Sequence, residues 1–284
     1  MVRIITDSAS DLELQEYNQL GVTCIPLYVL FGDKEYQENV NLSKDQFYRL
    51  LEQDANHPRT SQPSPHTLEH ILKEAMDTGD EAVVISLSSA LSGTCQSIMM
   101  TKNMLEYENC YVFDGLTATG GQRQLVEYAV KLRDTGKSAQ EIVEALEDIR
   151  SRITLYACMD TLEYLMRGGR ISRSTYAVGT LANVKPILRV SKEGTVEIPT
   201  KMIGMRRGID YMYKRLSEIP ADPQFPIYVM YTHNRKNGEV FAQLLNRNGY
   251  DIPDKHIINV GPAIGSHIGP NACGIVYIAK KDLA

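Results

Sequence analysis

Two hydroxyl side chains flank a glycine in the stretch Ala-Leu-Ser-Gly-Thr, residues 90–94. Ser92, Gly93 and Thr94 follow an apolar run that ends at Leu87, where a strand should pass into a helix. Free backbone N–H groups at a helix start, together with the helix dipole, favour a negatively charged ligand. The same residue types also serve as ordinary helix caps. The stretch therefore predicts either an anion site or a cap.

Three more loops carry polar groups in similar positions. Asp7 follows the first apolar run, Thr60-Ser61-Gln62-Pro63-Ser64 precedes a predicted helix, and His267 stands in Gly-Ser-His-Ile-Gly-Pro, residues 265–270. Asp7 fits a helix cap and a buried carboxylate that orients a hydroxyl equally well. For Thr60 and Ser64, a cap is the ordinary interpretation. The glycines around His267 predict a turn that a ligand can approach closely.

Three chemistries fit these groups. In hydrolysis, Ser92 would be the nucleophile, His267 the base and Asp7 its orienting acid, although Ser92 lacks a Gly-x-Ser-x-Gly context. Phosphate or nucleotide binding lacks both glycine-rich signatures and a clear acidic pair for magnesium. Non-covalent capture of a carboxylate needs only hydroxyls, amide N–H groups and an imidazole. The residues alone leave all three open.

The elements that must position these loops alternate in the first half of the chain. Capping patterns predict helices over 44–54, 65–77 and 139–151, which lie between short apolar strands typical of a buried parallel sheet. The predicted strands cover 2–6, 23–30, 82–87, 111–113 and 154–157.

The second half has a different pattern. Residues 185–190 and 195–203 predict an antiparallel hairpin, followed by helices over 206–219 and 236–248 and strands over 227–231, 256–260 and 274–279. We therefore predict an α/β protein of two domains. Residues 1–155 would form a mainly parallel sheet with flanking helices, and residues 156–284 an α/β domain with a mixed or antiparallel sheet.

Composition excludes several classes of protein. The 284 residues carry a net charge of −5 without a basic block, which argues against nucleic-acid binding. The sequence has neither a signal-peptide pattern nor an apolar run long enough to span a membrane, so we expect a cytoplasmic protein without stable membrane insertion. Its five cysteines stand singly, which argues against a zinc site and a disulfide framework.

Six motifs occur in the order and spacing of the DegV family, which this sequence resembles nearly from end to end. They are Thr6-Asp7-Ser8, Thr60-Ser61-Gln62-Pro63-Ser64, Leu91-Ser92-Gly93-Thr94, the run 162–171 with Arg-Gly-Gly-Arg, Lys185-Pro186-Ile187-Leu188, and Gly265-Ser266-His267-Ile268-Gly269-Pro270. Any one of them is weak, but six in order are specific.

The resemblance implies a protein that holds one long-chain fatty acid, such as palmitate or oleate, between its two domains. Bacterial proteins of this kind act as the fatty-acid-binding subunit of fatty acid kinase. They present the carboxylate to a separate ATP-dependent kinase subunit, which makes an acyl phosphate for phospholipid synthesis. The resemblance thus implies a carrier without a catalytic residue, cofactor or metal of its own. The alternative is a serine-dependent lipase or esterase that uses Ser92.

Carried over to this sequence, the family's carboxylate site falls on Thr60, assisted or replaced by Ser61, on Ser92 with the Gly93 amide, and on His267. Four arginines could form a basic face that docks the kinase or its phosphate donor, or could be ordinary surface: Arg167, Arg170, Arg173 and Arg206. The candidate walls of an acyl tunnel, which could equally be plain core, are Leu91, Ile98, Leu162, Leu165, Ile187, Ile264 and Ile268.

Three residues depart from the family pattern. Cys95 stands where an aromatic residue is common, Ile98 where a small residue is usual, and Asn271 in place of glycine in Gly-Pro-Gly. These changes leave the hydroxyls intact. We expect them to alter the shape of the pocket and hence the preference for acyl chains.

Overall fold

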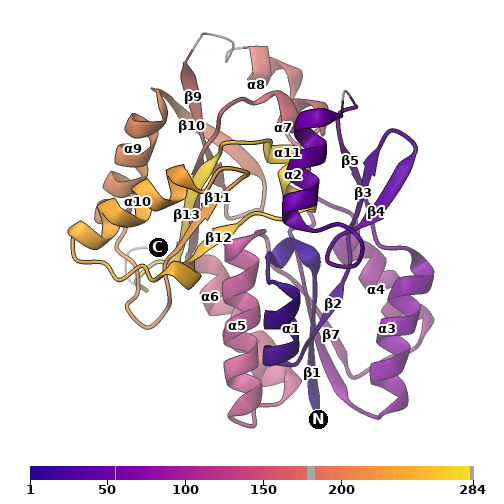
Figure 1. The fold of residues 1–284 in the computed structure, drawn as a ribbon. Coiled ribbons are helices and arrows are strands. Elements are labelled where there is room, and N and C mark those ends of the chain that lie inside the picture. The colour runs from indigo at the N-terminus through magenta and orange to yellow at the C-terminus, as the bar shows by residue number, and fades with distance from the viewer. Residues whose placement is uncertain (55, 178–182, 282–284) are drawn as a thin grey trace.

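A parallel sheet organises the first part of the chain (Figure 1). The computed structural model describes residues 1–54, 56–177 and 183–281. The sheet has the strand order β2-β1-β6-β7, with all neighbours parallel. Its strands are β1 (Val2–Asp7), β2 (Val22–Ile25), β6 (Glu81–Ser86) and β7 (Cys110–Asp114).

Helices cover both faces of this sheet. Along β1, Ile4 packs toward α1, α5 and α6, while Ile5 packs toward α3 and α4, as the two-residue period of a strand requires. The helices are α1 (Leu14–Leu20), α3 (Pro65–Asp77), α4 (Thr94–Met104), α5 (Gly120–Asp134) and α6 (Ala139–Arg152). Predicted helices 65–77 and 139–151 are confirmed, because Ser64 and Ser138 cap them as their sequences indicate.

A mixed sheet of six strands, in the order β10-β9-β8-β13-β11-β12, dominates the second part. Its strands are β8 (Ile153–Cys158), β9 (Val184–Val190), β10 (Val196–Ile203), β11 (Tyr228–Tyr231), β12 (Ile257–Asn259) and β13 (Cys273–Ile278). β9 and β10 form the predicted antiparallel hairpin, so the predicted fold class is confirmed. The division at residue 155 remains a prediction, although β8 already belongs to the second sheet from Ile153.

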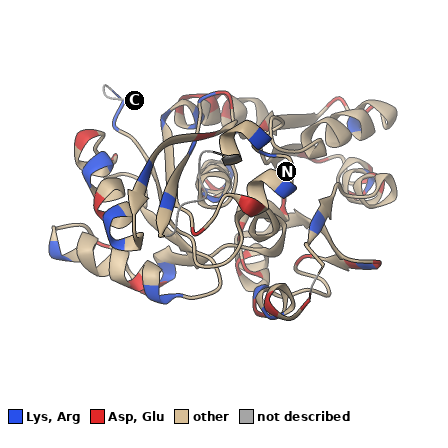
Figure 2. Cartoon of the chain, turned by 90° about the horizontal axis from the view of Figure 1, so that it is seen from above, with Lys and Arg blue, Asp and Glu red and all other residues tan. Residues whose placement is uncertain are grey.

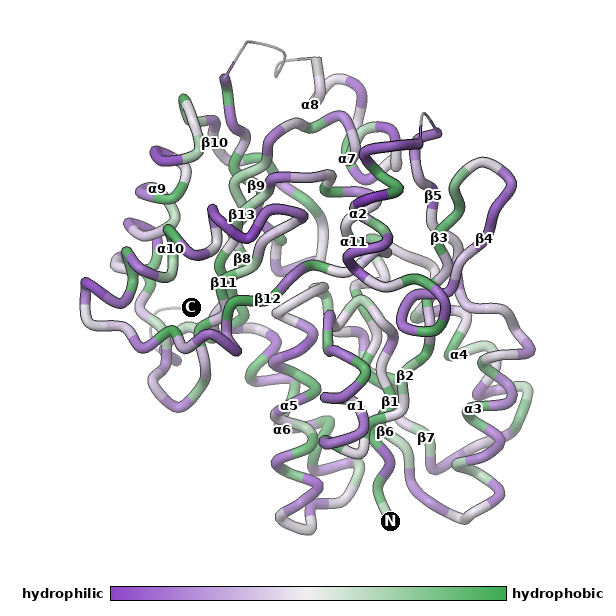
Figure 3. Tube along the Cα trace, viewed as in Figure 1, coloured by the Kyte–Doolittle hydropathy of each residue, from purple (hydrophilic) through white to green (hydrophobic). Residues whose placement is uncertain are grey.

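The six-stranded sheet buries both of its faces. On one face, Tyr156 and Cys158 pack with α9 (Met205–Glu218) and α10 (Lys236–Arg247), which lie on the outer side of the sheet in Figure 1. On the other face, Leu155 and Ala157 belong to a second apolar cluster that includes residues of α7 (Glu163–Arg167) and α11 (Pro262–Ile268). Figure 3 shows apolar residues concentrated in the strands. Among the described residues, no helix combines the length and the apolar composition needed to cross a bilayer.

The predicted strand 23–30 is wrong as a single element. β2 ends at Ile25, and β3 (Tyr28–Phe31) belongs to a separate antiparallel sheet with the order β4-β3-β5. Pro26 lies between them, and proline lacks the backbone N–H that a continuous strand needs. The other members of the small sheet are β4 (Lys34–Gln37) and β5 (Arg59–Ser61), and α2 (Lys44–Gln53) connects them.

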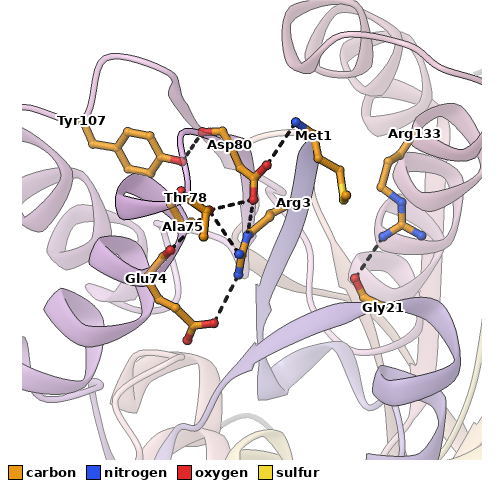
Figure 4. A network of polar contacts seen from close by, with 9 residues as sticks. All are labelled: Met1, Arg3, Gly21, Glu74, Ala75, Thr78, Asp80, Tyr107 and Arg133. Atoms are coloured by element: carbon orange, nitrogen blue, oxygen red, sulfur yellow. Dashed lines mark hydrogen bonds and ion pairs between the residues drawn. The ribbon is translucent and has the colours of Figure 1, made fainter.

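A polar network fixes the end of the parallel sheet at which β1 and β6 begin, opposite the loops that follow these strands (Figure 4). The Arg3 Nε donates to Asp80 Oδ2 at 2.8 Å, and the Met1 ammonium lies 3.0 Å from Asp80 Oδ1. Arg3 also contacts Glu74 at the end of α3, and the Tyr107 hydroxyl donates to the Asp80 carbonyl. These contacts lower the pKa of Asp80 and tie the start of β1 to the start of β6.

Two buried carboxyl groups lie beneath the first turn of α11. The Gly261 N–H donates to Asp11 Oδ1 at 2.8 Å, and the Ala263 N–H donates to Glu38 Oε2 at 3.3 Å. Burial and, to a smaller extent, the neighbouring Asp11 charge raise the pKa of Glu38 to about 8, although the Ser8 hydrogen bond and Lys44 oppose the shift. Burial also raises the pKa of Asp11. This acid pair anchors the helix that carries His267.

We predict that Glu38→Gln reduces the dependence of stability on pH. Between about pH 4.5 and 8, folded Glu38 keeps a proton that the unfolded chain has lost, so its contribution makes the free energy of unfolding fall as pH rises. Glutamine removes this titration, and its side-chain oxygen can still accept from Ser8 Oγ and from the Ala263 N–H. Urea unfolding from pH 5 to about 8 should therefore give a shallower decline for the variant. Exposed Glu35→Gln is the control, and parallel declines for wild type and Glu38→Gln would contradict the assignment.

Candidate functional site

A cavity of about 650 Å³ lies between the loops of the parallel sheet and the inner face of the six-stranded sheet. This volume is in the range of small-molecule sites. Its polar lining includes Thr60, Ser61, Gln62, Ser64, Ser92, Gly93, Ser97, Thr119, Arg170 and His267. Its apolar lining includes Leu27, Leu87, Leu91, Ala118, Leu155, Ala157, Leu165, Leu188, Val190, Val196, Met230, Val260, Ala263, Ile264, Ile268 and Ala272.

Thr60 and His267 meet at the polar end of the cavity. The Thr60 Oγ1 lies 2.8 Å from His267 Nε2, which joins β5 to α11 across more than 200 positions of sequence. The predicted turn around His267 is wrong, because Pro262 begins a helix there and His267 occupies its last turn. Gly269, at φ 75°, ends that helix. The glycine spacing marked a helix end rather than an open loop.

The imidazole of His267 is neutral at physiological pH. Burial, together with the positive charge of Arg170 and the nearby His57, lowers its pKa to about 3. Its Nδ1 is buried and has no hydrogen-bond partner among the described residues. A neutral imidazole can donate through one nitrogen and accept through the other.

Ser92 is both a cap and a cavity residue. Its Oγ accepts from the Thr94 N–H at 3.3 Å and lies 2.9 Å from Thr94 Oγ1, so it satisfies the first turn of α4. Gly93 is the N-cap residue, which confirms the predicted passage from strand to helix. The Gly93 N–H takes part in none of the hydrogen bonds found among the described residues. It therefore remains available to a ligand at the cavity wall.

The structure does not assemble a catalytic triad. Asp7 is fully buried and accepts from the Leu87 N–H at 2.8 Å and from Ser86 Oγ at 3.0 Å. Within the described parts of the chain, no hydrogen bond links Ser92 to His267 or His267 to Asp7. Both interpretations of Asp7 hold in part, because it caps the short 3₁₀ turn Ser8–Ser10 and also fixes neighbouring hydroxyls.

Arg170 lies in the cavity wall rather than on an open surface. Its Nε donates to the Leu91 carbonyl at 3.0 Å, and burial lowers its pKa. Among the described lining residues it is the only arginine or lysine, and no aspartate or glutamate lines the cavity beside it. Sequence reasoning assigned Arg170 to docking and missed this position. The sequence feature that could have indicated the position of Arg170 is Gly168-Gly169, because a glycine at residue 168 lets the backbone pass close to His267.

The remaining predicted docking residues are dispersed. Arg167 is exposed and pairs with Glu163, Arg173 is exposed on α8 (Arg173–Ala177), and Arg206 is exposed near the start of α9. α9 packs on the sheet face opposite the cavity, so Arg206 does not share an element with the others. Figure 2 shows basic and acidic residues interspersed over the helices, without a continuous basic face.

Four of the seven predicted tunnel residues line the cavity: Leu91, Leu165, Ile264 and Ile268. Ile187 does not, because it points to the opposite face of β9, where it packs toward α9, and its neighbour Leu188 lines the cavity instead. Ile98 belongs to the core between α3 and α4, and Leu162 lies in the apolar cluster on the inner face of the sheet without lining the cavity.

The three departures from the family pattern do not form the cavity wall. Cys95 and Ile98 are buried on α4, and Asn271 precedes β13 at φ 61°. None of the three is among the lining residues, so the expectation that they shape the pocket directly is wrong. The lining residues that sequence reasoning missed include Ala157, Leu188 and Met230 on the strands. The alternation of inward and outward residues in β8 and β9 was the signal that could have found them.

We predict that Gly168→Ala displaces His267. A Cβ at residue 168 would stand 2.1 Å from His267 Nδ1 and 3.1 Å from the Tyr164 carbonyl, so the imidazole must shift from its present position beside Thr60. Since burial lowers its pKa, a displaced His267 should titrate closer to its ordinary range. NMR titration of the histidine ring signals measures this change. Arg167→Ala, an adjacent exposed substitution, should leave the His267 signal in place, and an unchanged His267 in Gly168→Ala would refute the contact.

The sequence matches a family model described as "Uncharacterised protein, DegV family" over residues 1–280. A DegV domain-containing protein of Caldanaerobacter subterraneus is 30% identical, with 98% of this chain and 99% of the relative aligned. One from Halalkalibacterium halodurans is 31% identical, with 99% of each chain aligned.

Solved structures of DegV proteins also superpose on nearly the whole of this chain. A DegV family protein from Thermus thermophilus, described as fatty acid binding, superposes with a TM-score of 0.87 at 27% identity, covering 98% of this chain and 99% of that one. DegV from Bacillus subtilis, described as a fatty acid binding protein, gives 0.85 at 27% identity with the same coverage of each chain. Because the family model matches almost every residue, the chain belongs to the DegV family.

Proposed function

We propose that this protein binds one long-chain fatty acid, such as palmitate or oleate, with its acyl chain in the 650 Å³ cavity. One observation carries the proposal. The described lining combines a long apolar wall with a single cation, the half-buried Arg170, and no carboxylate. A partly desolvated cation without a carboxylate partner is unfavourable, and an anionic ligand would offset that cost. The relatives described as fatty acid binding support the same ligand class.

The carboxylate would lie against Thr60, Ser92, the Gly93 N–H and His267. If the neutral imidazole donates its Nε2–H to Thr60 Oγ1, the Thr60 hydroxyl keeps its own proton for the carboxylate. Hydrogen bonds to a charged acceptor are the stronger ones, so this relay gives His267 an orienting role. Ser61, which is exposed beside Thr60, provides an assisting hydroxyl. Arg170 supplies positive charge from the cavity wall.

The acyl chain would contribute most of the affinity. Each methylene moved from water into the apolar wall contributes about 0.8 kcal/mol. Leu155, Leu188 and Met230 on this wall are almost fully buried, whereas Ser61 and Gln62 at the polar end are exposed. The ligand would therefore be enclosed at its methyl end and accessible at its carboxylate.

An accessible carboxylate suits presentation to a second protein. We infer that the chain is a carrier without catalysis of its own, and that a separate ATP-dependent kinase subunit phosphorylates the bound carboxylate for phospholipid synthesis. The hydroxyl of Ser92 lacks an activating base, which favours binding over nucleophilic attack. Exposed Arg167 and Arg173 remain the docking candidates, because Arg170 faces the ligand and Arg206 lies on a separate element.

Native mass spectrometry tests the ligand. Protein purified from a recombinant host should retain one fatty acid, which organic extraction removes and added palmitate or oleate restores. Thr60→Val and Ser92→Ala should each weaken binding by about tenfold to a hundredfold, as expected for a lost bond to a charged group. Ser89→Ala removes an exposed hydroxyl that does not line the cavity, and it should bind normally.

Absence of lipid, together with failure to bind added palmitate or oleate, would overturn the carrier assignment. Hydrolysis of a simple ester by wild type, lost in Ser92→Ala while lipid binding persists, would identify a serine hydrolase instead.

We further predict that Arg173→Glu leaves fatty-acid binding intact but impairs presentation of the bound carboxylate to the kinase subunit. The variant should retain its fatty acid, because Arg173 does not line the cavity, but should support slower acyl phosphate formation with the kinase subunit and ATP. Lys281→Glu is the charge-matched control on a distant surface. Equal rates for wild type and Arg173→Glu would remove Arg173 from the docking surface.

A further inference from the structure

A second, much smaller cavity lies directly behind the apolar end of the first. It measures about 40 Å³ and shares two of its lining residues, Leu155 and Val190, with the larger cavity. These two side chains are therefore the partition between the spaces. The far side of the partition includes Thr117, Arg150 and Lys192, none of which lines the larger cavity.

Strand register places this partition away from the carboxylate site. Tyr156 pairs with Arg189, so the next residues outward, Leu155 and Val190, are neighbours across β8 and β9. Val196 of β10 pairs with Val190 and continues the row. β8 runs from this row toward α7 and Arg170, and the three residue steps from Leu155 to the end of the strand at Cys158 span roughly 10 Å. The partition therefore faces the methyl end of a ligand whose carboxylate lies near His267.

The small cavity behind the partition has polar groups in its lining, and side chains do not fill it. Thr117 is almost fully buried, and its Oγ1 has no hydrogen-bond partner among the described residues. Arg150 lines the space and is fixed in its wall, because its Nη1 donates to the Asp114 carbonyl at 2.8 Å and its guanidinium lies 4.8 Å from the centre of the Phe113 ring. A cavity of this size accommodates water, not several methylenes.

We propose that Leu155 and Val190 set the upper limit of acyl chain length. The proposal rests on the proposed fatty-acid binding and names the residues that decide which chains fit. A longer chain would have to displace both side chains and enter a polar space. Leu155 is the more decisive of the two, because it is buried on a central strand between β9 and β13, whereas Val190 ends its strand and is half-buried. Truncating Leu155 should merge the two cavities.

Competition among fatty acids tests this assignment. Delipidated wild type, Leu155→Ala and Leu188→Ala are each mixed with an equimolar series of saturated acids from myristate to behenate, and bound species are counted by native mass spectrometry. Leu188 is the matched control, because it has the same side chain on the same sheet face but lines only the larger cavity. Leu155→Ala should shift the bound population toward longer acids, by about fourfold for each methylene that enters the opened space.

The outcomes are distinct. An unchanged ranking in Leu155→Ala, or an equal shift in Leu188→Ala, would overturn the partition. Failure of wild type to bind any acid in the series would instead overturn the proposed function. If Leu155→Ala does not fold, as judged by circular dichroism, Val190→Leu provides the converse test. Its extra methylene should exclude the longest acids that wild type accepts, and a ranking like that of wild type would count against the proposal.

Discussion

The six-stranded sheet must cover both of its faces, and this requirement shapes the rest of the molecule. Odd and even positions of β8 face opposite sides, so Tyr156 and Cys158 build the core with α9 and α10, while Leu155 and Ala157 face the loops of the parallel sheet. The outer face is closed by close packing. The inner face is closed only in part, and the remaining apolar space is the cavity. One sheet thus supplies stability on one side and a binding wall on the other.

Few charged side chains lie near that wall. Arg170, which is half-buried, is the only arginine or lysine in the described cavity lining, His267 is neutral, and the carboxyls of Asp11 and Glu38 lie behind α11 instead of in the cavity. α11 connects these groups, since its first turn is anchored by the acid pair and its last turn holds His267 against Thr60. The position of the imidazole consequently depends on contacts at both ends of a seven-residue helix.

Much of the fold follows from local sequence. Ser64 with Pro65, and Ser138 with Glu141, begin helices where their capping patterns indicate, and the apolar runs become the strands of the parallel sheet. Elements decided by tertiary contact were not predictable in this way. α5 begins with Gly120 and Gly121, which have low helix propensity, and β4 and β5 of the small sheet have little apolar pattern of their own. Thr60, Ser92 and His267 could be grouped through ordered motifs, but Arg170 could not, because its burial depends on the path of the chain through Gly168.

The order of strands in the mixed sheet has a consequence for how the protein is made. β13 is the last of the described strands to leave the ribosome, yet it lies in the middle of the sheet, between β8 and β11. Until it is inserted, β8 and β11 have unpaired edges and the cavity has no continuous back wall. The parallel sheet can fold while synthesis continues, but the second sheet must wait for residues 273–278. The nascent chain therefore exposes apolar strands late in translation, when protection by chaperones matters most.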